Sequence, residues 1–358
     1  MSSQYRQFAA SWNVREFELS TEASGGFSKL DGPHKAPATR RDWVRLFEAL
    51  ALVFAALLLF AVFSVLSPAS FPTWANISIM LGSQSVLVML ALALIIPLTA
   101  GDFDLSVASV MSLSAMVLAI LTVRMGFPLA LAIPISIAVG ASVGVVNAGF
   151  ILFFRIPSLI VTLGMSTFLY GVVLWISGSN TIAGIPQQLI QWVVITRPLG
   201  IPIAFYYVIG LAALMWLFFD YTTPGRRLLF VGRNREVARL SGINVERTRL
   251  AALVASSVIA AAGGIIYGGM IGAADPVSGQ TFLLPAFAAA FLGATTITPG
   301  RFNAWGTVIA VYFLVIGITG LTMLGIETYV QHLFYGGALV LAVSLSQLVR
   351  KREPQDFS

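Results

Sequence analysis

The chain has 358 residues, of which 58% are hydrophobic and only 10% are charged, and its mean hydropathy is +0.89. Soluble domains carry about 25% charged residues, so this composition excludes an ordinary soluble protein and predicts an integral membrane protein. The net charge of +6 fits basic residues gathered on cytoplasmic loops rather than nucleic-acid binding. The absence of cysteine excludes disulfides and thiolate metal sites.

The N-terminal part of the chain is polar and irregular and contains no apolar segment of the signal-peptide type. We predict a cytoplasmic tail over 1–42, whose role the sequence does not indicate. A transmembrane domain is predicted over 43–349, and a short basic cytoplasmic tail over 350–358.

Apolar stretches of about 20 residues, the length that crosses a bilayer as a helix, follow one another along the transmembrane domain. They predict an all-α integral membrane protein with about ten transmembrane helices, some of them short or broken by proline. The predicted spans are 44–66, 75–98, 104–123, 129–154, 158–177, 204–219, 251–271, 283–297, 305–324 and 328–348. The eighth is short, and the sequence leaves open whether 283–298 crosses the bilayer fully.

The distribution of basic residues predicts the orientation. Ten spans place both termini in the cytoplasm, together with Arg155, Arg301 and the polar insert over 221–250. Among basic residues only Arg124 and Arg197 then fall outside.

The polar insert over 221–250 carries seven arginines between spans six and seven. Pro224-Gly225 is predicted to break the chain just after span six and to be followed by an extended arm over 226–232. A short helix over 235–240 is predicted next, which Asn234 caps and Gly242 ends. Asn244 is predicted to cap the next helix. A short rigid helix here suits mechanical coupling to a soluble partner, but the composition fits a loop that binds anionic lipid heads equally well.

Two carboxylates, Asp102 and Asp104, lie between spans two and three. Ionisable groups near the membrane usually face the bundle interior or mark a pathway, although Asp104 could instead cap the helix that follows it. Together with the neutral polar residues predicted at membrane depth, they make up the candidates for a solute path or gate: Gln84, Asp102, Asp104, Ser106, Asn147, Thr162 and Tyr267. The glycine pairs Gly140–Gly144 and Gly264–Gly268 have the spacing of closely packed helices.

Several catalytic motifs are missing from the sequence. It contains no GxxxxGK[ST] phosphate loop, no HExxH or Cys/His cluster and no GxSxG elbow. We therefore expect no catalytic residues, no metal and no cofactor, and no ATP hydrolysis through a phosphate loop of this chain.

Four stretches resemble segments of the ribose/xylose/galactose-type permeases of ABC sugar importers. They are AGDFDLSVASV over 100–110, IPSLIVTLG over 156–164, RLSGINVERTR over 239–249 and GATTITPG over 293–300. The resemblance runs from about 43 to 348 in the same order. The chain departs from the family pattern at Ala100 and Ala108, where glycine is usual, and over 282–285, where an acidic residue is replaced.

The resemblance implies a non-catalytic permease subunit with the type II importer fold, in the bacterial inner membrane. It implies a monosaccharide or related polyol as substrate, a periplasmic sugar-binding protein, a second permease copy, identical or different, and a cytoplasmic ATPase. The ATPase would dock on a coupling helix formed by Glu236, Arg239, Leu240, Gly242, Ile243 and Asn244. Alternatives are a branched-chain amino-acid or nucleoside ABC permease and, in another class, an ion-coupled secondary transporter.

Overall fold

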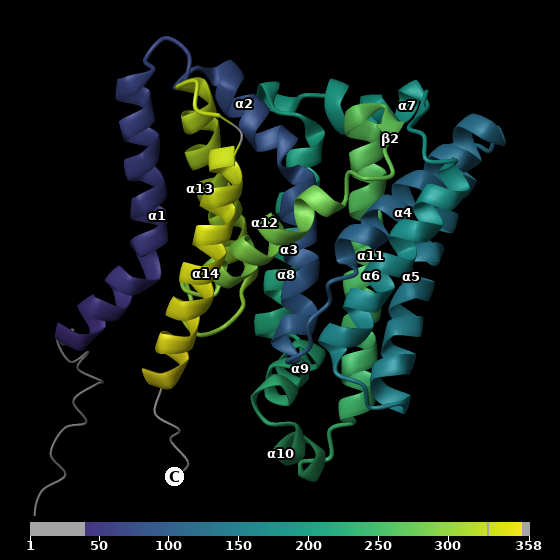
Figure 1. The fold of residues 1–358 in the computed structure, drawn as a ribbon. Helices are drawn as coiled ribbons and strands as arrows, with labels where there is room; N and C mark the ends of the chain where they lie inside the picture. Colours follow the sequence, from purple (N-terminus) through teal and green to yellow (C-terminus); the bar gives the residue numbers. More distant parts are fainter. Residues whose placement is uncertain (1–39, 328, 353–358) are drawn as a thin grey trace, which may run out of the picture.

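The computed structural model describes residues 40–327 and 329–352. Most of the predicted N-terminal tail and the last six residues of the chain lie outside this part. The described chain is a helical bundle, with one two-residue antiparallel strand pair, β1 (Ile182–Ala183) with β2 (Ala273–Ala274). Figure 1 shows that the start of α1 and the end of α14 lie at the same end of the bundle as α10.

The elements follow one another in the order that the apolar runs predict. The helices are α1 (Arg40–Leu66), α2 (Trp74–Ser83), α3 (Ser85–Thr99), α4 (Val107–Ala119), α5 (Leu129–Phe153), α6 (Ser158–Ser177), α7 (Gln187–Ile190), α8 (Ile203–Tyr221), α9 (Thr223–Arg233), α10 (Arg235–Leu240), α11 (Val245–Ile271), α12 (Gln280–Gly293), α13 (Ala304–Met323) and α14 (Tyr329–Arg352). Two π-helical turns, Ile120–Arg124 and Gln191–Ile195, and a 3₁₀ turn, Pro198–Gly200, complete the described elements.

The prediction of about ten spans is roughly confirmed. In the described residues, six helices are long and apolar enough to cross a membrane, and α2 with α3 makes a seventh span that bends by 41°. Three shorter apolar helices, Leu50–Leu66, Gln280–Gly293 and Tyr329–Ser344, account for the other predicted segments. At 1.5 Å per residue, α12 is only about 21 Å long, too short to cross the hydrocarbon core by itself.

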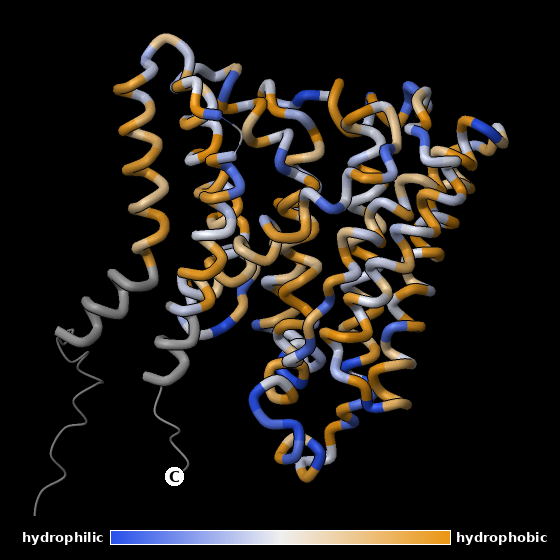
Figure 2. Tube along the Cα trace, viewed as in Figure 1, coloured by the Kyte–Doolittle hydropathy of each residue, from blue (hydrophilic) through white to orange (hydrophobic). Residues whose placement is uncertain are grey.

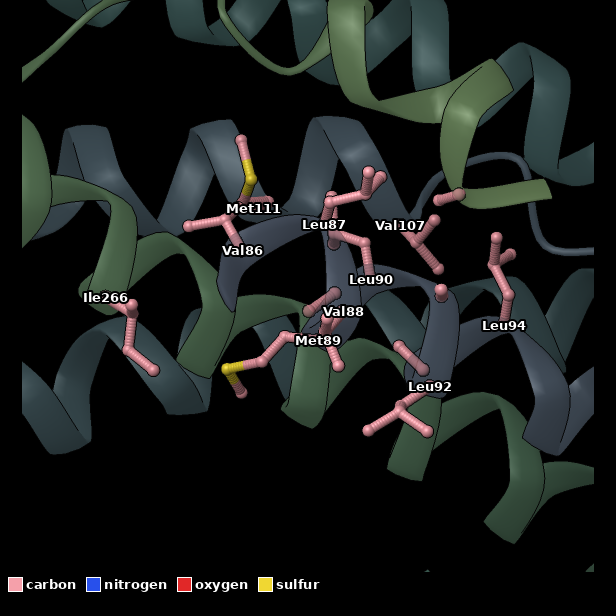
Figure 3. Packing of buried hydrophobic residues seen from close by; sticks show 14 of the residues in the cluster. Val86, Leu87, Val88, Met89, Leu90, Leu92, Leu94, Val107, Met111 and Ile266 are labelled. Atoms are coloured by element: carbon pink, nitrogen blue, oxygen red, sulfur yellow. The ribbon is translucent and has the colours of Figure 1, made fainter. Parts of the chain in front are cut away.

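Helix α3 forms the centre of the bundle, and all its residues are buried. It packs against α11, α12 and α13, since a helix that is apolar all round has no face suited to water. The core around it is drawn in Figure 3, which labels Val86, Leu87, Val88, Met89, Leu90, Leu92 and Leu94 of α3, Val107 and Met111 of α4 and Ile266 of α11. In contrast, hydrophilic residues gather in the insert after α8 (Figure 2).

Glycines let three helices approach closely. A β carbon on Gly144 of α5 would lie 2.8 Å from the Cα of Val254 on α11, and one on Gly264 of α11 would meet the backbone carbonyl of Met111 on α4. The close helix packing predicted from the glycine spacing is therefore confirmed for Gly144, for Gly264 and for Gly140, which meets Ala261 of α11, whereas Gly268 meets the side chain of Ile185 in the loop before α7.

The extended arm predicted over 226–232 is wrong: this stretch belongs to helix α9. The hydroxyl oxygen of Thr222 accepts a hydrogen bond from the Gly225 N–H at 3.2 Å, which caps the helix. Pro224 lies in the first turn, where a missing N–H costs nothing, so it starts the helix rather than breaking the chain. Leu228 and Val231 are buried, which gives the helix an apolar face.

Candidate functional site

The short helix predicted over 235–240 is present as α10, at the tip of the insert (Figure 1). The Asn234 side-chain oxygen accepts hydrogen bonds from the N–H groups of Glu236 and Val237, at 3.0 and 3.1 Å. Gly242 follows the helix with a φ of 79°, a left-handed conformation that glycine adopts without strain. The helix therefore has a defined start and end.

The insert is held together by a small apolar core and by polar contacts. Val231, Ala238 and Val245 are buried together, with Ile243 packed against them. The Asn244 side chain caps α11 by accepting a hydrogen bond from the Arg247 N–H at 2.9 Å. These contacts join α9, α10 and the start of α11 into one unit.

The surface of this unit combines an ion pair with an exposed apolar side chain. Arg239 donates to the Glu246 carboxylate at 2.7 Å, and both side chains are more than half exposed. Leu240 is 89% exposed at the end of α10. The exposed end of α10 therefore presents an apolar side chain next to a charged pair.

Asp102, in the connection between α3 and α4, is the point at which this unit meets the membrane bundle. The Arg249 guanidinium of α11 donates two hydrogen bonds to the Asp102 carboxylate, from Nε at 2.7 Å and from Nη2 at 2.6 Å. The Asp102 side chain is 3% exposed and that of Arg249 is 14% exposed. A buried bidentate ion pair fixes both the distance between the two side chains and their relative orientation.

Arg235 of α10 adds a second link to the same connection. Its Nη2 donates to Asp102 Oδ1 at 3.1 Å and to the Gly101 carbonyl oxygen at 3.0 Å. Gly232 lies directly against the end of α3, where a β carbon would collide with the Thr99 carbonyl oxygen. Both α9 and α10 therefore contact the end of α3 and the α3–α4 connection directly.

A second polar cluster lies behind Asp102 and is completely buried. The Asp104 carboxylate accepts hydrogen bonds from the Ser106 N–H at 3.0 Å, from the Ser106 hydroxyl at 2.6 Å and from the Ser256 hydroxyl at 3.1 Å. Helix α4 begins only at Val107, so Asp104 bonds a free backbone N–H one residue before the helix. Asn147 of α5 donates to the Ser106 hydroxyl at 2.9 Å.

The third contact of the α3–α4 connection is with α6. The Thr162 hydroxyl accepts from the Leu105 N–H at 3.1 Å, and the Ser158 hydroxyl accepts from the Phe103 N–H at 3.0 Å. Four helices, α5, α6, α10 and α11, thus hold the residues 102–106 in place. The structure brings together five of the predicted path residues: Asp102, Asp104, Ser106, Asn147 and Thr162.

Two other path candidates lie elsewhere. Gln84 is at the bend between α2 and α3, where its amide donates to the neighbouring Ser83 hydroxyl at 3.4 Å. Tyr267 lies on α11 with its ring against Phe282, at a centroid separation of 6.1 Å. Within residues 40–327 and 329–352, no group of three or more His, Asp or Glu is placed so that it could hold a metal ion.

Similarity to known proteins identifies the family. A model of the family described as the permease component of a branched-chain amino acid transport system matches residues 76–343, well over half of the chain. The chain belongs to this permease family. No solved structure matches the permease.

The permease is also similar to three transport subunits of Escherichia coli K12. It is 32% identical to the ribose import permease protein over 302 residues, which cover 83% of this chain and 93% of the relative. It is 30% identical to the D-allose transport system permease protein, over 81% of this chain and 89% of the relative. It is 27% identical to the xylose transport system permease protein, over 95% of this chain and 99% of the relative.

Four residues of the site are absent from the predictions made from sequence: the two arginines that hold Asp102, and also Ser158 and Ser256. Arg235 and Arg249 are among seven arginines of the insert, and nothing local distinguishes them from the others. The sequence predicts these partners only indirectly. A carboxylate near the membrane requires a cationic partner, and the insert is the segment richest in arginine.

Proposed function

We propose that this permease is the membrane subunit of an ATP-driven importer and forms the path by which a monosaccharide or related polyol crosses the bacterial inner membrane. The three relatives support the sugar, because their names give ribose, allose and xylose. The description of the matching family names branched-chain amino acids instead, so an amino-acid permease is the nearest alternative.

The observation that carries the proposal is the structure of the insert. Its exposed end, with Leu240 and the Arg239–Glu246 pair, is rigidly joined through Arg235 and Arg249 to Asp102 in the α3–α4 connection. A soluble partner that moved α10 would therefore act directly on the connection that precedes α4. This is the arrangement expected of a permease whose energy comes from ATP hydrolysed by another subunit.

The proposed partners are a cytoplasmic ATPase on α10, a periplasmic sugar-binding protein at the opposite end and a second permease copy. The positive-inside rule supports a cytoplasmic α10, since the insert is rich in arginine. The start of α1 and the end of α14 share that end of the bundle (Figure 1), which supports two cytoplasmic termini. In this proposal the permease contributes no catalytic residue. Its helical bundle is proposed to have the type II importer fold.

Uptake into liposomes tests the proposal. The permease is reconstituted with a candidate ATPase and binding protein, with ATP enclosed or omitted, and radiolabelled ribose, xylose, allose and leucine are compared. We expect uptake of a sugar that requires both ATP and the binding protein. Uptake driven by an ion gradient without ATP would instead identify a secondary transporter, and uptake of leucine alone would favour the amino-acid alternative.

A further inference from the structure

A surface pocket separate from the polar cluster lies between the end of α8, the side of α9 and the connection from α12 to α13. It is a shallow hollow that is open to the outside, with a cavity volume of about 60 Å³. Trp216, Phe219 and Asp220 of α8 form one wall, and Arg301 and Trp305 lie on the other.

The pocket contains one acid and one base that do not contact each other. Asp220 and Arg301 both line it. Within the described part of the chain, neither side chain forms a salt bridge with a distance of 4.0 Å or less. Their side chains also make no hydrogen bond with the described residues. A ligand that carries both a negative and a positive group would satisfy both charges at once.

The depth of the pocket indicates where such a ligand would come from. Asp220 is the last residue but one of the span Ile203–Tyr221, and Trp305 is the second residue of the span Ala304–Met323. Indole side chains are enriched at the level of the lipid head groups, where one end of the ring is apolar and the other is wet. The pocket therefore opens at the membrane–water boundary.

Hydrogen bonds within the protein hold the wall that the α12–α13 connection forms. The Asn303 amide donates to the carbonyl oxygens of Gly293, Thr296 and Arg301, at 3.1, 3.0 and 3.2 Å. Ile297, which also lines the pocket, has a φ of 61°, a conformation that is costly for a β-branched residue and persists only where the surroundings impose it. A preformed wall lowers the entropic cost of binding.

We propose that this pocket binds the head group of a zwitterionic phospholipid with a primary amine, phosphatidylethanolamine. Arg301 holds the phosphate and Asp220 accepts hydrogen bonds from the ammonium group, while Trp216 and Trp305 flank the glycerol region. Because Leu229 of α9 lines the same pocket, the lipid would contact the insert that carries α10.

Native mass spectrometry of the delipidated full-length permease tests this site. The permease is titrated with phosphatidylethanolamine, phosphatidylcholine and phosphatidylglycerol of identical acyl chains. We expect one saturable phosphatidylethanolamine, bound about tenfold more tightly than phosphatidylcholine, whose quaternary ammonium cannot donate to Asp220. Arg301→Gln weakens the binding of both phosphatidylethanolamine and phosphatidylglycerol about tenfold, whereas Asp220→Asn weakens only that of phosphatidylethanolamine.

Arg227→Gln on α9 and Glu327→Gln after α13 are matched controls, because both residues are exposed and outside the pocket lining, and they leave the binding unchanged. The double exchange Asp220→Arg with Arg301→Asp restores part of the preference if either single variant folds poorly. Unchanged phosphatidylethanolamine binding in both single variants overturns the proposal. Equal competition by inorganic phosphate overturns it too, because it would identify a simple anion site.

Discussion

Arg249, in the first turns of α11, donates two hydrogen bonds of 2.6 and 2.7 Å to Asp102, which precedes it by 147 positions. Both partners are largely buried, so the pair fixes the base of the insert against the α3–α4 connection. The Asp104 cluster lies next to it and is held by α5, through Asn147 and Ser106, and by α11. In the proposed coupling from α10 to the bundle, the Asp102 carboxylate is the group that Arg235 and Arg249 hold together.

The destabilising effects of removing Asp102 and of removing Arg249 should not add, because the two side chains form one buried pair. Asp102→Asn leaves Arg249 with a buried charge and no counter-charge, which costs about 3 kcal/mol by analogy with other buried pairs. Arg249→Gln should cost less, because Arg235 still pairs with the Asp102 carboxylate, and the double variant should cost clearly less than the sum of the two single variants. Midpoints of thermal unfolding in detergent measure the cycle, and strictly additive effects would show that the pair contributes nothing.

The exposed pair at the end of the insert should behave differently. Arg239 and Glu246 are both more than half exposed, so solvent screens their attraction. Glu246→Gln and Arg239→Gln should therefore lower stability by less than about 1 kcal/mol. If these variants keep normal stability but lose ATP-dependent uptake, the loss reports on docking of the ATPase. A large loss of stability would contradict the surface role.

Two glycines of the insert allow the effect of a steric clash to be compared with the effect of a strained backbone angle. Gly232→Ala should displace the insert from α3, because the new methyl group would overlap with the Thr99 carbonyl oxygen. Gly242→Ala meets no atom within 4 Å and should cost only about 1 kcal/mol, for the left-handed φ of 79°. Unfolding midpoints and uptake are measured together for both variants. Equal stability of Gly232→Ala and Gly242→Ala would rule out the close contact.

The orientation can be tested with single cysteines, because the natural chain has none. Leu240 on α10 and Leu199, in the 3₁₀ turn before α8, are 89% and 83% exposed and should lie on opposite sides of the membrane. In intact spheroplasts a membrane-impermeant thiol reagent should label Leu199→Cys and not Leu240→Cys. Inside-out vesicles should give the opposite result, and labelling of Leu240→Cys from outside would reverse the proposed topology.

The local features of the fold are predictable from sequence, and the long-range ones are not. Apolar runs predict the spans because burial in lipid imposes a simple length rule. Asn234, Gly242 and Asn244 are confirmed as helix boundaries, since caps bond the backbone within three residues. The prediction fails at α9 because Pro224-Gly225 resembles a break in the chain, although Pro also suits the first turn of a helix.

The candidate site shows the same division. Asp102 and Asp104 stand out in the sequence because carboxylates are rare in this chain between 49 and 219. Their partners do not stand out: Arg249 and Ser256 are about 150 positions away in the sequence, and the packing of α11 against α3, α4 and α5 brings them near. The expectation that proline breaks some of the spans does not locate the bend of the second span: the bend lies at Gln84, and Pro97 lies in the last turn of α3.

The most direct test of the coupling proposal is crosslinking between α10 and the ATPase in the assembled importer. A short thiol-to-amine crosslinker is attached at Leu240→Cys, with Leu199→Cys as the similarly exposed control at the opposite end. We predict a permease–ATPase product from Leu240→Cys that depends on an assembled complex, and no such product from Leu199→Cys. Absence of the product from Leu240→Cys in a complex that transports sugar, or its formation from Leu199→Cys, would contradict the assignment of α10 as the coupling helix.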